Sequence, residues 1–130
     1  MYALDTNTVI YFFKDQGQVA PNLLAKAPSE IAVPAIVLFE LETGIAKSRD
    51  PKKRERQLAH LLQFTRILPF DAQVAKTTAI LRARLETAGQ PIGPMDTLIA
   101  GTALYHRATL VTHNTKEFSR IPNLKLEDWH

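Results

Sequence analysis

The chain has 130 residues, and its shares of hydrophobic residues (45%) and charged residues (22%) are close to the averages of globular proteins. It contains no cysteine, which excludes disulfides, thiolate metal sites and cysteine nucleophiles. Because it lacks an apolar run of membrane-spanning length and an N-terminal signal pattern, we expect no membrane segment, a cytoplasmic location and a single domain over residues 1–130.

The net charge of +3 comes from one segment. Residues 47–56 contain six basic and two acidic side chains, so the remainder of the chain has a net charge of −1. A basic segment of this kind can attract the phosphates of a nucleic acid, although it can equally be a solvated helix face. Lys52, Lys53 and Arg56 are the candidate RNA-binding residues within it.

Short apolar segments alternate with helical patterns along the chain. Strands are expected, in chain order, at residues 2–4, 30–33, 67–68, 109–112 and 124–126. Helices are expected after Asp5-Thr6-Asn7, from Pro34 to about residue 48, from Pro51, over residues 71–88, and from Pro94 to about residue 107. This alternation predicts an α/β domain with a mainly parallel sheet flanked by helices. In such sheets, ligands bind outside the carboxyl ends of the strands.

Three acids and an amide are placed to meet at that edge of the sheet. Asp5 ends the first strand, and Asn114 follows the strand before the last. Asp96 lies in the first turn of its helix and shares a face with apolar residues, where a carboxylate needs a partner. Glu40 lies in an apolar helical run, but periodicity does not distinguish it from Glu42.

Each of these residues also has a purely structural explanation. Asp5 can cap a helix, Asp96 suits the dipole of a helix N-terminus, and Asn114 is an ordinary turn residue. Together, however, converging carboxylates repel one another unless a cation joins them, and Mg²⁺ prefers such oxygen ligands. A divalent ion can activate water and neutralise a phosphate, so acids beside a basic segment indicate a phosphodiester hydrolase.

Two other functions fit parts of the pattern. An aspartate-nucleophile phosphatase would also place Asp5 after a strand, but it normally needs a second acid two residues later, where this chain has Asn7. A catalytically silent RNA-binding module of the same fold would not need its acids, and this chain retains Asp5, Glu40 and Asp96.

Four sequence segments resemble the PIN-domain nucleases, and more narrowly the VapC toxins of type II toxin–antitoxin modules. They are MYALDTN at the start, FELETG around Glu40, PIGPMDTLIAGTA around Asp96, and LVTHNTKEF around Asn114. The resemblance extends from residue 1 to the terminal LEDWH. PIGPMD followed by IAG is most similar to the branch that cleaves initiator tRNA in the anticodon stem-loop, which inhibits translation.

This resemblance implies a PIN-like fold and a metal-dependent endoribonuclease. By position, Asp5 and Asp96 would bind Mg²⁺, for which Mn²⁺ can substitute, and Glu40 would complete the acidic pocket. Thr6 would orient a water on the metal or Asp5 itself. Asn114 stands where many PIN domains have a fourth acid. Because an amide replaces that acid, the number of bound ions stays open, although the initiator-tRNA branch commonly has an amide at this position.

The resemblance also implies the partners of the protein. They are an RNA substrate, a second copy of the chain in a homodimer, and a cognate VapB-type antitoxin whose C-terminal segment covers the pocket with a basic side chain. Glu117, one helical turn after Asn114, is a further candidate for assisting the site.

Overall fold

The computed structural model describes all 130 residues and contains a five-stranded sheet in the order β3-β2-β1-β4-β5, in which every pair is parallel. The strands are β1 (Tyr2–Leu4), β2 (Ile31–Pro34), β3 (Arg66–Leu68), β4 (Thr109–Val111) and β5 (Leu126–Glu127). The helices are α1 (Thr6–Phe13), α2 (Val19–Leu24), α3 (Ala35–Ala46), α4 (Lys52–Leu62), α5 (Ala72–Thr87), α6 (Pro94–Tyr105) and α7 (Thr115–Phe118), with a 3₁₀ turn at Pro28–Glu30. The predicted α/β class with a parallel sheet is therefore confirmed.

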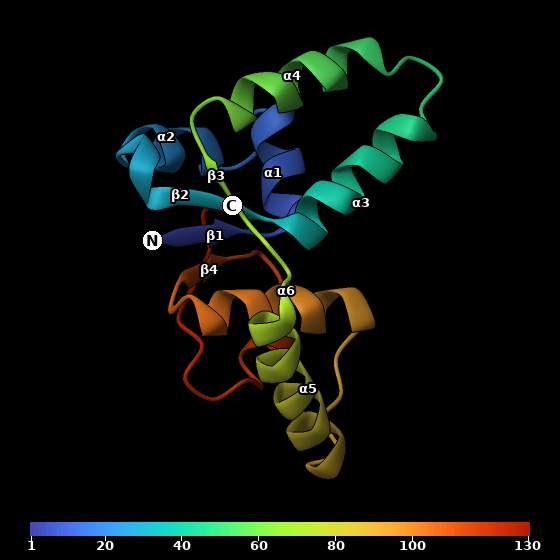
Figure 1. Cartoon of the computed structure of the whole chain (residues 1–130). Coiled ribbons are helices and arrows are strands. Elements are labelled where there is room, and N and C mark those ends of the chain that lie inside the picture. Colours follow the sequence, from blue (N-terminus) through green and yellow to red (C-terminus); the bar gives the residue numbers. More distant parts are fainter.

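The helices lie in two layers around the sheet (Figure 1). Helices α1 to α4 cover one face, and α5 and α6 cover the other. Helices α3 and α4 run side by side away from the sheet and form an arm, whose tip is the loop of residues 47–51. No helix is both long and apolar enough to cross a membrane.

Local signals set where several helices begin. The side chain of Asp5 accepts a hydrogen bond from the amide of Thr8 at 2.8 Å and caps α1. Asp71 caps α5 in the same way, through the amide of Val74 at 3.0 Å. Pro94 occupies the first turn of α6, where its missing N–H has no helical partner to lose.

The buried apolar residues form one cluster between the layers. Its fully buried members include Leu4, Val33 and Leu110 from the three central strands, together with Val37 of α3 and Ile99 of α6. These strands are buried on both faces, which is why they read as continuous apolar runs instead of alternating patterns.

The structure departs from the predicted elements in three places. Helices α2 and α7 were not expected, because α2 contains Pro21 and buries only Val19, and α7 is only four residues long. The last strand lies at Leu126–Glu127 instead of 124–126. The helix expected from Pro51 is α4, which buries Leu58 and Leu61 and ends at Leu62.

Candidate active site

Four acidic side chains from different elements converge at the carboxyl edge of the sheet. Asp5 follows β1, Glu40 lies in α3, Asp96 lies in the first turn of α6, and Glu117 lies in α7. The charges of Glu117, Asp5 and Glu40 all contribute to raising the pKa of Asp96, so each of these three carboxylates lies close enough to act on Asp96.

Asp5 is held rigidly at the centre of this group. Its amide donates to the carbonyl of Val111 at 3.1 Å, which continues the pairing of β1 with β4, and its carboxylate accepts from the amide of Thr8. Only 6% of the residue is exposed. Burial raises the pKa of Asp5, and the charge of Asp128 adds to this rise, whereas hydrogen bonds from Thr112 and Thr8 oppose it.

Asp96 carries the clearest electrostatic signature of the site. Its side chain is half-buried on the face of α6 that also presents the buried Ile99 and Ala100, as the helical spacing predicted. Burial first, and then the neighbouring carboxylates, raise the pKa of Asp96 to about 6. The group of acids has no cationic partner, because the ion pairs of the structure are Arg82–Glu86 and His113–Asp128. Such an arrangement favours a bound cation.

The structure separates Glu40 from Glu42, which periodicity could not do. The hydroxyl of Thr6, the first residue of α1, donates to the Glu40 carboxylate at 2.5 Å. Glu42 is exposed on another face of α3. The hydroxyl of Thr6 therefore positions Glu40, and it is the amide of Thr8 that holds Asp5.

Asn114 and Glu117 act as a pair at the start of α7. The amide nitrogen of the Asn114 side chain donates to the Glu117 carboxylate at 3.0 Å, and the backbone N–H of Asn114 donates to the hydroxyl of Thr112 at 3.0 Å. The fourth carboxylate of the group is thus supplied by Glu117, three residues after the position that the resemblance indicated. The i, i+3 spacing from Asn114 was the only sequence signal for it.

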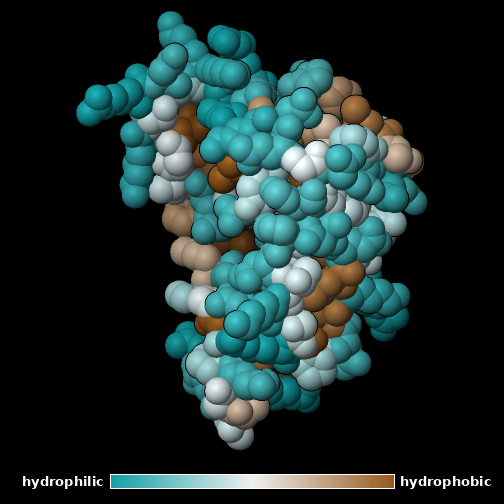
Figure 2. All heavy atoms as spheres, turned by 180° about the vertical axis from the view of Figure 1, so that it is seen from behind, coloured by the Kyte–Doolittle hydropathy of each residue, from teal (hydrophilic) through white to brown (hydrophobic).

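The basic segment lies on the arm formed by α3 and α4. Lys52, Lys53 and Arg56 are exposed on α4, and in the view of Figure 2 hydrophilic side chains project at the tip of the arm. Arg54, which no sequence pattern distinguishes from the other basic residues of the segment, lines a cavity together with Glu40 and Lys14. Because Arg54 lies four residues before the buried Leu58, its side chain shares the inward face of α4, and it lies over the ring of Phe13 at 5.7 Å.

The four carboxylates can hold a divalent cation only if water completes its coordination. No three His, Asp or Glu side chains are arranged to enclose an ion by themselves. Mg²⁺, however, is usually bound through one or two carboxylates and retains several waters. Asp5 and Asp96 are the best candidates, because both pKa values are raised by burial and by other carboxylates, and neither residue has an ion-pair partner.

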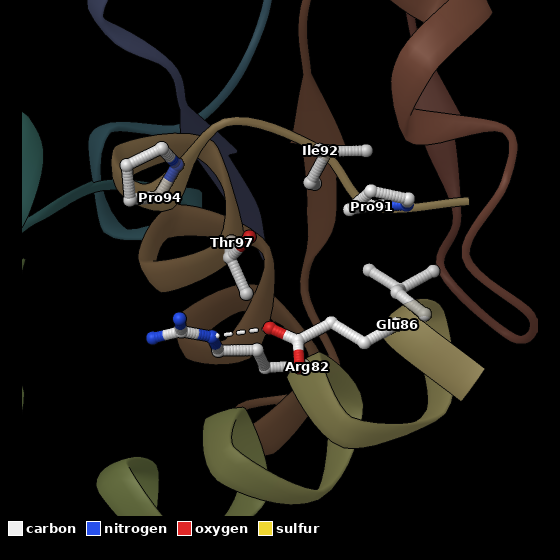
Figure 3. Close-up of a pocket in the computed structure, with 7 residues that line it drawn as sticks. Arg82, Glu86, Pro91, Ile92, Pro94 and Thr97 are labelled. Carbon is white, nitrogen blue, oxygen red and sulfur yellow. Dashed lines mark hydrogen bonds and ion pairs between the residues drawn. The ribbon is translucent and has the colours of Figure 1, made fainter. Parts of the chain in front are cut away.

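A second concave surface, at the crossing of α5 and α6, has different chemistry. Figure 3 shows it lined by Arg82, Glu86, Pro91, Ile92, Pro94 and Thr97. Its only carboxylate, that of Glu86, is paired with Arg82 at 2.9 Å, and the hydroxyl of Thr97 donates to the carbonyl of Gly93. The charged and hydroxyl groups of this pocket already have partners, so we place the candidate active site at the four carboxylates.

Comparison with known proteins connects this geometry to a family. The sequence model of the PIN-domain family matches residues 2–124 of this chain. A relative named ribonuclease VapC2, from Rickettsia felis, is 42% identical over 99% of this chain and 98% of the relative. A relative named tRNA(fMet)-specific endonuclease VapC, from Salmonella typhimurium, is 34% identical over 98% of this chain and 97% of the relative.

A solved structure gives the same result for the fold. The crystal structure of VapBC2 from Rickettsia felis, bound to a DNA fragment from their promoter, contains a chain that superposes with a TM-score of 0.92. That chain is 40% identical, and the match covers 99% of this chain and 98% of the other.

Proposed function

The chain belongs to the PIN-domain family, and we propose that it is a metal-dependent endoribonuclease, the toxin of a toxin–antitoxin module, formed by one domain over residues 1–130. The observation that carries this proposal is the group of four carboxylates without a cationic partner, in which the pKa of Asp96 is raised to about 6. The sequence identity to proteins named ribonuclease VapC2 and tRNA(fMet)-specific endonuclease VapC supports it.

Asp5 and Asp96 would hold the ion, which we propose to be Mg²⁺, with Mn²⁺ able to substitute. When bound, the ion would activate water for attack on a phosphodiester and neutralise the phosphate. The chain's own residues prepare this site in the absence of the ion. The amide of Thr8 fixes Asp5, the hydroxyl of Thr6 fixes Glu40, and the side chain of Asn114 fixes Glu117.

The proposed substrate is initiator tRNA, cleaved in the anticodon stem-loop so that translation is inhibited. The PIGPMD segment around Asp96 and the relative named tRNA(fMet)-specific endonuclease support this substrate. The arm that bears Lys52, Lys53 and Arg56 would contact the phosphates of the RNA, since basic side chains position a nucleic acid without reading its sequence.

A VapB-type antitoxin is the proposed protein partner. The chain superposes closely on a chain of a VapBC2 complex. An apolar groove on α1, α2 and α4 offers a place for a peptide segment of that partner, and hydrophobic side chains lie on the α2 side of the molecule in Figure 2. The groove is lined by the side chains of Phe12, Leu23, Leu24, Leu61 and Phe64.

We also propose a homodimer, which would cover exposed apolar side chains such as Phe39 and Ile80.

The test is cleavage of initiator tRNA by the purified protein with Mg²⁺ or Mn²⁺. Hydrolysis by water should leave 5′-phosphate and 3′-hydroxyl ends, and EDTA should abolish it. Asp5→Asn and Asp96→Asn keep the shape of the side chain but remove the charge, so both should lose at least about 100-fold in rate.

Glu42→Gln is the matched control, because Glu42 is exposed on the same helix as Glu40. It should cleave at the wild-type rate. Wild-type activity in Asp96→Asn would contradict the site, and cleavage in EDTA with cyclic-phosphate ends would contradict the mechanism. A phosphorylated Asp5 intermediate would instead favour a phosphatase.

A further inference from the structure

Three aromatic rings gather beside the four carboxylates, on the side of β4 and β5. The imidazole of His113 stacks on that of His130, with ring centroids 4.2 Å apart and planes 26° apart. The ring of Tyr11, from α1, meets both edge-on, at 4.5 Å from His130 and 6.0 Å from His113. Tyr11 lies more than a hundred residues before both histidines in the chain.

This ring cluster, Tyr11, His113 and His130, is held in place by polar contacts. Nδ1 of His113 lies 3.0 Å from the Asp128 carboxylate, and the backbone N–H of His130 donates to the other oxygen of Asp128 at 2.9 Å. The amide N–H of Gln18 is shared between the backbone oxygens of Trp129 and His130, at 2.9 and 3.1 Å.

Gly17 allows the closest of these approaches. It has a φ of +64°, and a Cβ at this position would lie 2.4 Å from a backbone oxygen of His130. Only glycine permits both this conformation and this contact. Residue 130 is therefore fixed against the loop after α1 and does not hang free.

Tyr11 packs against the hydrophobic core, whereas the two histidines of the ring cluster lie outside it. The last two residues of the chain differ sharply in exposure. Trp129 is only 4% exposed, whereas His130 is exposed. The side chain of His113 is 49% exposed. Two stacked rings that remain open to solvent gain little from burial, yet they present aromatic surface to a ligand.

The position of the ring cluster relates it to the acids. His113 directly precedes Asn114, and Tyr11 lies on the helix that Asp5 caps. In the sheet order β2-β1-β4-β5, the arm with the basic segment follows β2, Tyr11 follows β1, and the two histidines follow β4 and β5. Asp5, at the end of the strand between β2 and β4, therefore lies between the basic arm on one side and the two histidines on the other.

We propose that Tyr11, His113 and His130 form a stacking platform for one nucleobase of the RNA, next to the phosphate that is cleaved. Proteins bind unpaired bases by stacking them on aromatic and histidine rings. An RNA strand that crosses the acids would have phosphates on the basic arm and an unstacked base on the ring cluster, which would determine the cleavage position. This inference rests on the proposed ribonuclease function.

The experiment combines protein variants with abasic substrates. The probe is the anticodon stem-loop of initiator tRNA, in which each nucleotide near the cleavage site is replaced in turn by an abasic one. Binding is measured by fluorescence anisotropy in EDTA, and cleavage is measured separately with Mg²⁺. The variants are His113→Leu, His130→Leu, and His113→Phe, which keeps an aromatic ring without the contact to Asp128.

For wild type, one abasic position should weaken binding about 10-fold, as expected for the loss of one stacked base. His113→Leu and His130→Leu should weaken binding of the intact stem-loop by a similar factor, and the same abasic change should then have no further effect. KM should rise with little change in kcat, and His113→Phe should restore most of the binding. Melting curves identify any variant that fails to fold. If one of the two leucine variants does not fold, the other is compared with wild type.

Equal losses on abasic substitution in wild type and in the leucine variants would overturn the platform, as would failure of His113→Phe to bind better than His113→Leu. A protein that binds this RNA but cleaves none of it with Mg²⁺ would contradict the proposed function, while the binding comparison would still decide on the platform.

Discussion

The hydroxyl of Thr6 donates to the carboxylate of Glu40, and this contact joins the first residue of α1 to the middle of α3 across 34 positions in sequence. It aims one carboxylate toward the others, at the place where Asp5 follows β1. A hydrogen bond to a charged group contributes about 1.5–3 kcal/mol. The contact therefore offsets part of the repulsion that Glu40 meets beside Asp96.

Thr6→Val should lower the cleavage rate about 10-fold, because the β-branched shape is kept while the hydroxyl that positions Glu40 is lost. Thr6→Ser restores the hydroxyl and should retain most of the activity. Single-turnover cleavage of the tRNA stem-loop, with melting curves to verify folding, measures both. If Thr6→Val cleaves as fast as wild type, the Thr6–Glu40 contact has no role in the reaction.

The charge of Asp96 should make the metal-free protein less stable as the pH rises. Its pKa is about 6 in the folded protein and near the ordinary value of 3.8 in the unfolded chain, so between these values the folded protein binds more protons. The free energy of unfolding then falls from pH 4 to pH 6. Asp96→Asn lacks this component and should be more stable than wild type above pH 6, by roughly 1 kcal/mol after allowance for the partial exposure of the side chain.

Melting curves from pH 4 to pH 8, recorded in EDTA, measure the difference between the two proteins. Asp5, whose pKa is also raised, is present in both proteins, so the difference between them reports the charge of Asp96 together with its coupling to the neighbouring carboxylates. Saturating Mn²⁺ at pH 7.5 should stabilise wild type and should stabilise Asp96→Asn much less. If Asp96→Asn melts lower than wild type at every pH, Asp96 is a helix-dipole partner and not one member of a repelling group.

The basic segment should contribute to RNA affinity through phosphates. Changing Lys52, Lys53 and Arg56 together to glutamine should weaken RNA binding at low salt. The slope of the logarithm of the binding constant against the logarithm of the salt concentration should become shallower by about 2 to 3, because each phosphate contact contributes roughly 0.7–0.9 to it. The cleavage position should stay unchanged. A matched control replaces three exposed basic residues on the other side of the sheet, Lys76, Arg84 and Arg107. Equal slopes for the two triple variants would make the segment an ordinary solvated helix face.

Gly101 should be indispensable to the packing of α5 on α6. A Cβ at this position would lie 1.9 Å from the hydroxyl oxygen of Thr78, 2.6 Å from its Cβ and 3.0 Å from its Cα, so the backbone of α5 would have to shift. Gly101→Ala should destabilise the fold by about 2–3 kcal/mol. Gly44→Ala, also in a helix but with nothing within 4 Å, should stabilise it by about 0.5–1 kcal/mol. Urea unfolding compares them, and similar effects of the two changes would contradict the packing.

Local physical signals in the sequence determined much of the fold. The apolar strands, the caps at Asp5 and Asp71 and the prolines that begin helices depend on neighbours within a few residues, so the parallel α/β architecture could be predicted. The same local rules placed Asp5 and Asp96 at one edge of the sheet, because parallel strands and the helices between them return to that edge.

Tertiary packing decided which side chains complete the site. Helical periodicity gives the face of a residue but neither its depth nor its partner across the molecule, so only the contact with Thr6 distinguishes Glu40 from Glu42. The ring cluster likewise depends on Gly17, because the backbone of residue 130 occupies the space that a Cβ at position 17 would need, although the two residues are far apart in sequence. Such contacts are set by the way the layers pack together, so short-range sequence patterns do not predict them.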